Sequence, residues 1–599
     1  MLSTVNIKSI CSNLLLIFIL SIFFSCQKDL SLEGGGTVVT PPDLSTKISS
    51  SVSGFVTDEN DAPVKSATVQ FGSSTVTTDK YGYFEVKNVQ VIKEAAVVTV
   101  SKTGYFKGIK TYMAKEGKSA FFRIKLIPKT TVGTINSSTG GTVTLASGLS
   151  VKLNAGTVVN AATNLPYTGT VNVTAFWLNP EATDFNRTVP GDLRGIDKNG
   201  ALKLMRTYGM ATVELTGSSG ELLQITNGQK ATLTIPIPAS MSSSAPTTIP
   251  LSYFDEAKGL GKEEGSAIKT GNLYVAEVSH FSWWWLSLPG PYVQFECTVK
   301  DNLGNPLSYV SAGFAYYYSG GGGFSVAFGD ADVNGYISGP IPANLAMEFD
   351  IFSHEQCSNR VVYRQNITTT TQDISLGNVV INGFNTIASI TGKIVDCNNA
   401  ADPNTCVFIR DYYYYYRVTP NSQGIFNFST LICSSPTNIG VTAQNLTTLQ
   451  YGNEQVFSVV TGNNNIGNIS ACGNLPQEFM HFTVDGNNYN FDPPSAYFGN
   501  YIWPAGIITN YGYTTLGDFA GFDFTEQGIG VNSVQELQVV KVYPVQDSMI
   551  VSHPTPVNIT EYGATGQYIS GNFSGIFQSF FHPPLTYNVS CTFRIKRNY

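Results

Sequence analysis

Charged residues are scarce in this sequence. Asp, Glu, Lys and Arg together make up 13% of its 599 residues, and the formal net charge is −7. The charges are spread along the chain, and neither sign forms a run. Proteins that bind nucleic acid present a clustered basic face, so the sequence predicts no nucleic-acid partner.

Catalytic and metal-binding motifs are lacking as well. The chain has only five histidines, and none of them stands in an HExxH motif. It also has no GxSxG motif and no phosphate-binding glycine loop. The sequence therefore predicts no metal site, no cofactor and no enzymatic activity. Because the two carboxylates of a glycoside hydrolase can come from distant strands, a hydrolase is kept as the third and least favoured alternative.

Cysteines are few, and their spacing excludes a zinc knuckle. Of the nine cysteines, Cys11 and Cys26 lie in the N-terminal stretch, and the other seven form no closely spaced pair. In an exported protein such cysteines form disulfides. We expect pairing within the segment Cys397–Cys472, with at least one thiol left free because the number is odd.

Aromatic and small polar residues, in contrast, are plentiful. Aromatic residues make up 12% of the chain, much of which is Gly, Thr, Ser and Asn. β-branched and aromatic residues in short alternating runs pack well on pleated sheets. A chain of this length divides into about four to six modules of ~100–150 residues. The sequence therefore predicts an all-β protein, built as a string of about five β-sandwich domains of Ig-like or transthyretin-like type.

The N-terminal segment indicates export. Lys8 precedes the apolar run Leu14–Phe24, which is too short to span a bilayer as a helix and is typical of a signal peptide. The run ends just before Cys26 and resembles the lipobox of Gram-negative bacterial lipoproteins, with Phe23 in place of the usual Leu. This resemblance implies that Cys26 carries lipid and anchors the protein to the bacterial outer membrane, on its surface or its periplasmic side. Ordinary cleavage nearby, followed by secretion, is the alternative.

The first predicted domain, residues 48–128, is marked by two turns. Asp58 and Pro63 bracket one turn, and Asp79 and Gly82 form a hairpin turn between alternating runs. This segment resembles the carboxypeptidase regulatory-like domain. The resemblance implies a seven-stranded transthyretin-like sandwich that acts as a non-catalytic stalk or binding module, with glycan as one possible ligand.

The same turn spacing returns twice further along the chain. Asp332 and Gly335 repeat the offset of the first hairpin turn, and a third, weaker copy carries Asn421 and Gly424. The three copies predict an array of related sandwiches. We expect Gly82 and Gly335 to adopt positive φ, which is costly for residues with a Cβ.

The region between the first two copies carries the densest motifs of the chain. It opens with "GGTVTLASGLSVKLNAGTV" at Gly140, which resembles the domain shared by zonula-occludens proteins and netrin receptors. The later elements "PGDL" and "TYGM" resemble cartilage intermediate layer protein. These resemblances imply an extracellular β-sandwich of matrix type, without an enzymatic role. Gly261 stands where an aromatic residue is usual, so we expect looser packing at that position.

The triplet His280-Phe281-Ser282 resembles the self-cleavage site of the "function-to-find" domains. That resemblance implies attack of the Ser282 hydroxyl on the carbonyl of Phe281, with His280 as the base. Alternation along a strand would place His280 and Ser282 on one face. The other interpretation, which the three following tryptophans favour, is a structural histidine and a hydrogen-bonded serine in a closing strand.

Two runs of tyrosine are the candidates for ligand contact. Tyr317 lies in one run, and Tyr413 and Tyr415 lie in the other. Alternation points half of each run outward, where the rings could stack on sugars. The second interpretation, that they are strand residues half-buried between modules, is favoured.

These patterns predict a membrane-anchored, non-catalytic scaffold or adhesion protein that binds glycan or protein. A carbohydrate-binding accessory lipoprotein beside a hydrolase is the alternative, and a surface protein that cleaves itself at Phe281-Ser282 is less favoured. The last domain is expected to be an antiparallel sandwich or barrel. The predicted boundaries are 1–26 for the signal peptide, 27–47 for the tether, and 48–128, 129–290, 291–382, 383–473 and 474–599 for the domains.

Overall fold

The computed structural model describes residues 41–598 with internal gaps. Within these residues the chain is all-β, as the sequence predicts, with one α-helix and one short 3-10 helix. The lipidation candidate Cys26 lies outside the described residues. The gaps are 318–322, 354–356, 358–359, 383–386, 413, 447–449, 473–477, 486, 492–495, 503–506, 515–518, 526–529, 541–549 and 580–585.

The first sandwich packs a three-stranded sheet, in the order β4-β1-β7, on a four-stranded sheet, in the order β3-β2-β5-β6. Strand β1 pairs antiparallel with β4 and parallel with β7. Valines and phenylalanines that alternate along these strands fill its core. Its strands are β1 (Lys47–Thr57), β2 (Thr68–Phe71), β3 (Ser74–Thr77), β4 (Tyr83–Ile92), β5 (Ala96–Ser101), β6 (Gly108–Tyr112) and β7 (Ser119–Lys125).

The second sandwich repeats this topology strand for strand. Its sheets have the orders β24-β21-β27 and β23-β22-β25-β26, and its first and last strands again pair in parallel. The strands are β21 (Tyr292–Asp301), β22 (Ser311–Tyr317), β23 (Gly323–Asp330), β24 (Tyr336–Pro342), β25 (Ala346–Phe352), β26 (Val361–Thr368) and β27 (Ile374–Ile381).

The third sandwich has the same topology once more. Its sheets have the orders β31-β28-β34 and β30-β29-β32-β33, with β28 and β34 parallel. The strands are β28 (Ile387–Val395), β29 (Thr405–Asp411), β30 (Tyr414–Val418), β31 (Ile425–Leu431), β32 (Thr437–Asn445), β33 (Gln455–Val459) and β34 (Gly462–Ser470).

The predicted tight turn is present in all three sandwiches, but the expectation that it is a hairpin turn is wrong, because the two strands that it joins, such as β3 and β4, lie in different sheets. In the first, Oδ1 of Asp79 accepts hydrogen bonds from the backbone N–H groups of Tyr81 and Tyr83, at 2.8 and 2.9 Å. Oδ1 of Asp332 accepts the equivalent pair in the second sandwich, at 2.8 and 2.9 Å. Oδ1 of Asn421 accepts them in the third, at 2.9 and 3.0 Å. A side-chain oxygen that holds two backbone donors fixes the turn locally.

The glycine of each turn is confirmed to have positive φ. The φ angles are +73° at Gly82, +74° at Gly335 and +77° at Gly424. A Cβ on Gly82 would lie 2.3 Å from the carbonyl oxygen of Val56. A Cβ on Gly335 or Gly424 would lie 2.3 or 2.5 Å from a carbonyl oxygen in the first strand of its own sandwich. The turn therefore needs glycine both for its conformation and for the close approach of two backbones.

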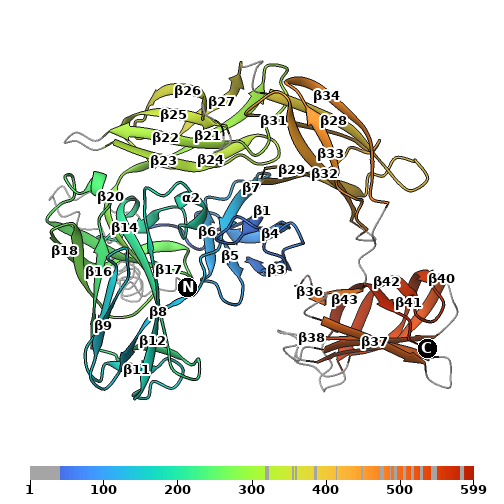
Figure 1. Cartoon of the computed structure of the whole chain (residues 1–599), viewed down its shortest axis with the longest axis horizontal. Helices are drawn as coiled ribbons and strands as arrows, with labels where there is room; N and C mark the ends of the chain where they lie inside the picture. Colours follow the sequence, from blue (N-terminus) through green and yellow to red (C-terminus); the bar gives the residue numbers. More distant parts are fainter. Residues whose placement is uncertain are drawn as a thin grey trace, which may run out of the picture. The chain divides into compact units, whose positions relative to one another are not determined.

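A central domain follows the first sandwich and precedes the second in the sequence. It forms a single 13-stranded sheet system from β8 to β20 (Figure 1). Its elements are β8 (Thr131–Asn136), β9 (Gly141–Thr144), β10 (Ser150–Leu153), β11 (Val158–Asn160), β12 (Thr170–Leu178), α2 (Phe185–Thr188), β13 (Arg194–Ile196), β14 (Leu202–Thr216), β15 (Leu222–Ile225), β16 (Ala231–Pro236), η1 (Ala239–Met241), β17 (Thr248–Asp255), β18 (Leu260–Thr270), β19 (Leu273–Val278) and β20 (Trp283–Gly290).

Strand β20 divides its three tryptophans between two apolar clusters. Trp284 belongs to the main core of the central domain, whereas Trp283 and Trp285 belong to a cluster on the other side of the sheet. A Cβ on Gly261 would lie 2.9 Å from the ring of Trp285. The expectation of looser packing at Gly261 is therefore wrong, because Trp285 fills the space that an aromatic residue there would need.

The C-terminal domain is one antiparallel sheet of nine strands, in the order β36-β35-β43-β42-β41-β40-β39-β38-β37. The amide of Asn500 in β37 donates to the carbonyl of Lys596 in β43, at 3.0 Å, so this part of β37 lies against β43. The strands are β35 (Phe479–Val484), β36 (Asn487–Phe491), β37 (Ala496–Ile502), β38 (Ile507–Thr514), β39 (Phe519–Thr525), β40 (Gly530–Val540), β41 (Ile550–Tyr562), β42 (Tyr568–Ser579) and β43 (Thr586–Lys596).

Two disulfides join cysteines of the described residues. Cys397–Cys472 closes the third sandwich, within the segment predicted from the sequence. Cys357–Cys433 was not predicted, and it connects the second sandwich to the third. Three buried cysteines remain as free thiols, Cys297, Cys406 and Cys591.

The close approach at Gly82 leads to a stability prediction. Replacing Gly117, which has φ +68° and nothing within 4 Å of its would-be Cβ, by Val should cost about 1–3 kcal/mol of unfolding free energy through backbone strain alone. Gly82→Val should cost at least about 1 kcal/mol more, because its Cβ also meets a backbone oxygen. Denaturant unfolding of the two purified variants measures the difference. Equal losses of unfolding free energy in the two variants would show that the contact with Val56 does not affect stability.

Candidate functional site

The first sandwich is held on the central domain by a buried lysine. Nζ of Lys110 in β6 donates to the carbonyl oxygens of Asn186 and Val189, at 2.6 and 2.7 Å, around the end of helix α2. These carbonyl groups lie where a helix leaves its acceptors without partners of their own. Burial lowers the pKa of Lys110 to about 7. Next to it, Oγ1 of Thr111 donates to the carbonyl of Gly259, at 2.6 Å.

An apolar cluster lies beside this polar contact. Phe106 of the first sandwich meets Trp283 edge to face, with ring centroids 6.2 Å apart. The motif stretch from Phe185 and the loop at Gly259 therefore serve as a docking surface for the first sandwich. The buried members of the cluster are Phe106, Ile109 and Ile127 from the first sandwich side and Leu178, Phe185, Val189, Met205, Met210, Phe254, Trp283 and Trp285 from the central domain.

The first sandwich also contacts the third. The ring of Tyr81, in the turn that Asp79 fixes, lies 4.2 Å from the ring of Phe408. Nη1 of Arg417 donates to the hydroxyl of Tyr83 and to the carboxylate of Glu85, both at 3.1 Å. Aromatic packing and an ion pair that is largely shielded from solvent thus act at the same contact.

Tyr309 brings the second sandwich into the same assembly. Its ring lies 4.6 Å from that of Phe121 in the first sandwich and 5.7 Å from that of Tyr416 in the third. Its hydroxyl donates to the carbonyl of Arg417, at 2.8 Å. Burial raises the pKa of Tyr309 well above its usual range, so this hydroxyl remains a hydrogen-bond donor at neutral pH.

Arg123 of β7 lies among aromatic rings from two sandwiches. Its guanidinium carbon is 5.4 and 5.6 Å from the ring centroids of Phe55 and Phe121, and 4.8 and 5.2 Å from those of Tyr414 and Tyr416. Only 9% of the Arg123 side chain is exposed. A desolvated cation against several ring faces is a favourable cation–π arrangement.

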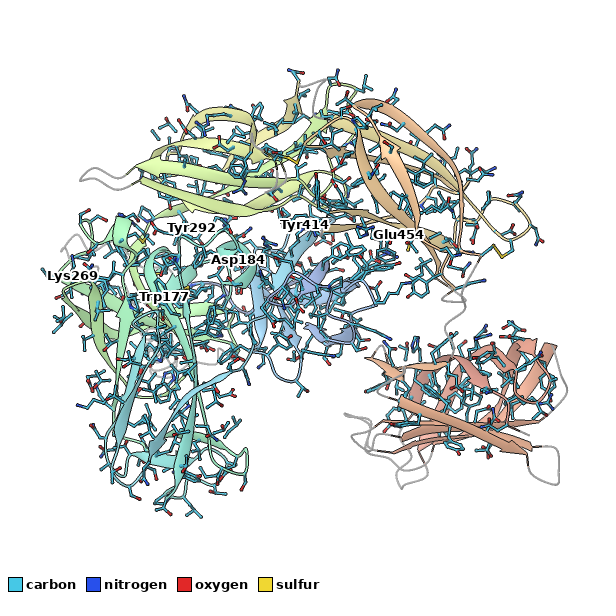
Figure 2. The ribbon with its side chains drawn as sticks, in the orientation of Figure 1. Trp177, Asp184, Lys269, Tyr292, Tyr414 and Glu454 are labelled. Carbon is cyan, nitrogen blue, oxygen red and sulfur yellow. A yellow bond between two sulfur atoms is a disulfide. The ribbon has the colours of Figure 1, made fainter. Side chains whose placement is uncertain are left out.

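A cavity of about 460 Å³, here named the junction cavity, lies next to Arg123. The three sandwiches and the central domain all contribute residues to its wall. Arg187 of helix α2 approaches the ring of Tyr414, at 5.8 Å, from the central domain; Tyr414 is labelled in Figure 2. The polar and aromatic residues of the wall that matter most are Arg123, Arg187, Asp330, Arg360, Tyr414 and Tyr416.

This arrangement is suited to binding. A cavity of this size falls in the usual range of small-molecule sites, about 300–1,000 Å³. Its guanidinium groups donate hydrogen bonds, while Asp330 accepts one from the hydroxyl of Ser311, at 2.5 Å. Among the described residues no group of three or more His, Cys, Asp or Glu side chains could hold a metal ion.

None of the predicted tyrosines is among the described residues that line the junction cavity. Tyr415 is half-buried, and its ring lies 5.1 Å from that of Tyr81, as in the second of the two interpretations, burial between modules. Tyr413 lies outside the described residues, and of Tyr317 only the backbone, in strand β22, is described. Whether any of the three binds a ligand remains a prediction.

The triplet His280-Phe281-Ser282 does not lie in a strand. It forms the bend between β19 and β20, so the expectation that strand alternation would align His280 with Ser282 is wrong. The ring of His280 packs on that of Trp284, with centroids 4.9 Å apart. Its Nε2 lies 3.6 Å from the carboxylate of Glu264.

The peptide groups of Phe281 are held by one side chain. The amide of Gln224 accepts from the N–H of Phe281 at 2.9 Å and donates to its carbonyl at 3.3 Å. The hydroxyl of Ser282 donates to the carbonyl of Trp283, at 3.3 Å. The hydroxyl is therefore engaged with the following residue, and the Phe281 carbonyl it would attack is fixed by Gln224.

Sequence reasoning missed Arg123, Arg187, Arg360 and Tyr414. Arg123 stands within strand β7, "SAFFRIK", directly after two phenylalanines and before a buried isoleucine. An arginine at such a position is the one local signal of a buried or interfacial cation. Two of its four partner rings, those of Tyr414 and Tyr416, come from sequence positions almost 300 residues away, and no pattern in the sequence connects them to Arg123.

Comparison with known proteins gives a family for one segment. Residues 51–126 match the carboxypeptidase regulatory-like domain, so the first sandwich carries that domain. No curated protein matches the chain.

Several solved structures are similar to parts of the chain. The Bacillus anthracis TIE protein shows 11% identity over 70% of this chain and half of its own length, with a TM-score of 0.14. The shaft pilin SpaA of Lactobacillus rhamnosus GG shows 11% identity over 31% of this chain and all of its own, with a TM-score of 0.17. BcpA, the major pilin subunit of Bacillus cereus, shows 9% identity over 71% of this chain and 99% of its own, with a TM-score of 0.12. Likeness at these TM-scores carries no argument about function.

The Asp79 turn at the contact with the third sandwich predicts a pH dependence. The residue as a whole is half-buried, yet desolvation of its carboxyl raises the pKa of Asp79 from 3.8 to about 6. A raised carboxyl pKa means that the folded state favours the protonated form. The resulting stability is fully present below pH 3.8 and is lost as the pH rises through about 6.

Asp79→Asn should remove this loss, since Asn421 holds the same turn in the third sandwich. We expect the variant to gain roughly 1–2 kcal/mol of unfolding free energy at pH 7.5 and little at pH 4. Denaturant unfolding at both pH values measures the change. A gain of the same size at both would contradict the assignment to Asp79 ionisation.

The geometry of the triplet predicts an intact peptide bond. Because Gln224 fixes Phe281 and the Ser282 hydroxyl is engaged elsewhere, we expect purified protein to give one band on a denaturing gel after prolonged incubation at neutral pH. The Ser282→Ala variant serves as control and should run identically. Two wild-type fragments divided at Ser282, restored to one band by Ser282→Ala, would establish self-cleavage instead.

Proposed function

We propose that this chain is a non-catalytic surface scaffold or adhesion protein, anchored to the bacterial outer membrane by lipid on Cys26, which binds glycan or protein. The observation that carries the proposal is the junction of the three sandwiches and the central domain. Aromatic, ionic or hydrogen-bonded contacts act at their meeting points. Domains that share large apolar contacts hold their positions, whereas small polar interfaces leave them free to move.

The cysteine pattern supports an exported location. Disulfides persist in oxidising compartments, and two of them join described residues of this chain. No helix in the described part of the chain has the length and apolarity to cross a membrane. In the proposal, the lipid at Cys26 attaches the chain to the membrane, because several acyl chains bind a membrane far more firmly than one.

A carbohydrate-binding accessory lipoprotein that works beside a hydrolase is the second candidate. The observation that favours it is the junction cavity, because its wall combines tyrosine rings with donors and acceptors of hydrogen bonds. The two candidates differ in whether binding requires a partner enzyme, and they share the anchor and the junction of the domains.

The anchor is tested by membrane fractionation of cells that express the chain. Cys26→Ala should move the protein from the detergent-dependent membrane fraction to the soluble fraction, because the lipid would be absent. Cys11→Ala, which changes the other cysteine of the N-terminal stretch, should leave it in the membrane. Membrane retention of Cys26→Ala would contradict the proposed anchor.

Binding is tested with the soluble Cys26→Ala chain on a glycan array and in pull-downs from cell-surface extracts. Retention of a glycan or of a surface protein without turnover supports the scaffold. Co-purification with a hydrolase, whose activity on a polysaccharide rises in its presence, supports the accessory candidate. Hydrolysis of polysaccharide or peptide by the isolated chain would exclude both.

A further inference from the structure

We infer that the junction cavity binds a carboxylated sugar unit of a glycan. The inference rests on the glycan-binding form of the proposed function and adds the site and the ligand class. The carboxylate would be held by guanidinium groups, and the sugar ring would lie against tyrosine. None of the tyrosines singled out in the sequence forms this wall. Its tyrosines are Tyr309, Tyr414 and Tyr416.

The cavity wall has more positive than negative charge. Its arginines are Arg123, Arg187 and Arg360, and its carboxylates are Asp330 and Glu181. Nε of Arg123 lies 3.9 Å from Asp330, and Glu181 accepts a hydrogen bond from the hydroxyl of a serine of the central domain. In the described part of the chain no carboxylate lies within ion-pair distance of Arg360, which leaves one guanidinium group available for an anion.

The position and the chemistry of Arg360 also suit it to bind a carboxylate. It follows β25 in the second sandwich, is exposed to solvent, and lies with its guanidinium carbon 5.7 Å from the ring of Phe352. A planar guanidinium binds a carboxylate with two parallel hydrogen bonds, a geometry that an ammonium group does not offer. Because both Arg360 and Glu181 are exposed, the cavity opens to solvent where they lie.

The aromatic part of the wall is held in place. The guanidinium groups of Arg123 and Arg187 both approach the ring of Tyr414, with their carbons 4.8 and 5.8 Å from its centroid. Tyr416 is buried, and its ring packs on that of Phe428 at 5.2 Å. Rings fixed in this way lose little conformational freedom when a ligand binds, and this preorganisation favours affinity.

Polar groups between the charged and aromatic residues fit a hydroxyl-rich ligand. Asn186 of helix α2 is half-buried in the wall, and its backbone carbonyl is already engaged by Lys110. Its side-chain amide provides both a donor and an acceptor. Thr430, on the third-sandwich side, is 4% exposed and provides a hydroxyl. Sugar hydroxyls, which both donate and accept, match such a mixed wall.

The test is isothermal titration calorimetry of the soluble Cys26→Ala chain with three probes. Trigalacturonate carries carboxylates on sugar rings, maltotriose carries rings without carboxylates, and succinate carries carboxylates without rings. We expect saturable binding of trigalacturonate and none of the other two at the same concentrations. Equal binding of maltotriose would overturn the role of the carboxylate, and equal binding of succinate would overturn the role of the ring. Absence of all binding would overturn the inference.

Single substitutions test whether trigalacturonate binds at Arg360. Arg360→Gln should weaken trigalacturonate binding about tenfold or more, and Arg360→Glu should abolish it, through loss and then reversal of the charge. Arg410→Gln is the matched control: its guanidinium pairs with Glu454 on the third sandwich and lies outside the cavity wall. Because Arg360 is exposed, its variants should keep the wild-type melting curve. Trigalacturonate affinity that is unchanged in both Arg360 variants would overturn the site.

The inference and the proposed function fail separately. If trigalacturonate does not bind but the chain still retains a glycan or protein in the array or pull-down, only the carboxylated sugar at the junction cavity is excluded. If Cys26→Ala stays in the membrane, while the same chain after detergent extraction binds trigalacturonate with the expected dependence on Arg360, the anchor is wrong and the cavity assignment stands.

Discussion

The desolvated charge of Arg123 is the constraint on which the arrangement of the three sandwiches depends. A guanidinium group that is 9% exposed has lost most of its hydration, and that loss is large unless ring faces or carboxylates replace the water. The replacement comes from the first and third sandwiches as rings and from the second as Asp330. No single domain could satisfy this cation, so its burial requires that the domains stay together.

The three sandwiches show how one fold can be reused with different surfaces. Each keeps the turn in which a side-chain oxygen holds two backbone donors and a glycine lies against the first strand. Outside the turn they diverge. The first offers Tyr81, the second Tyr309 and the third Tyr416, at different places in the fold, and these rings contact the neighbouring sandwiches. Local chemistry thus maintains the domain, while aromatic substitutions on its outer faces determine which partner it meets.

Much of the fold could be predicted because the signals are local. The positive φ of Gly82 and Gly335 follows from residues within one turn, and the all-β class follows from alternation over a few residues. The junction could not be predicted, because its partners are distant in sequence. The expectation of looser packing at Gly261 was wrong for the same reason, because the ring that fills the space beside Gly261 belongs to the distant residue Trp285. Likewise, no sequence pattern around Tyr414 or Arg123 indicates that these two residues are in contact.

The parallel pairing of the first and last strands, found in all three sandwiches, has a mechanical consequence. When paired terminal strands are parallel, the chain enters a sandwich at one end and leaves it at the opposite end. A pulling force along the chain then acts along the strands and loads all the hydrogen bonds of the pair at once in shear. Antiparallel terminal strands would instead be peeled apart one bond at a time. Each sandwich is thus built to bear tension, and Cys357–Cys433 adds a covalent path for that load between the second and the third.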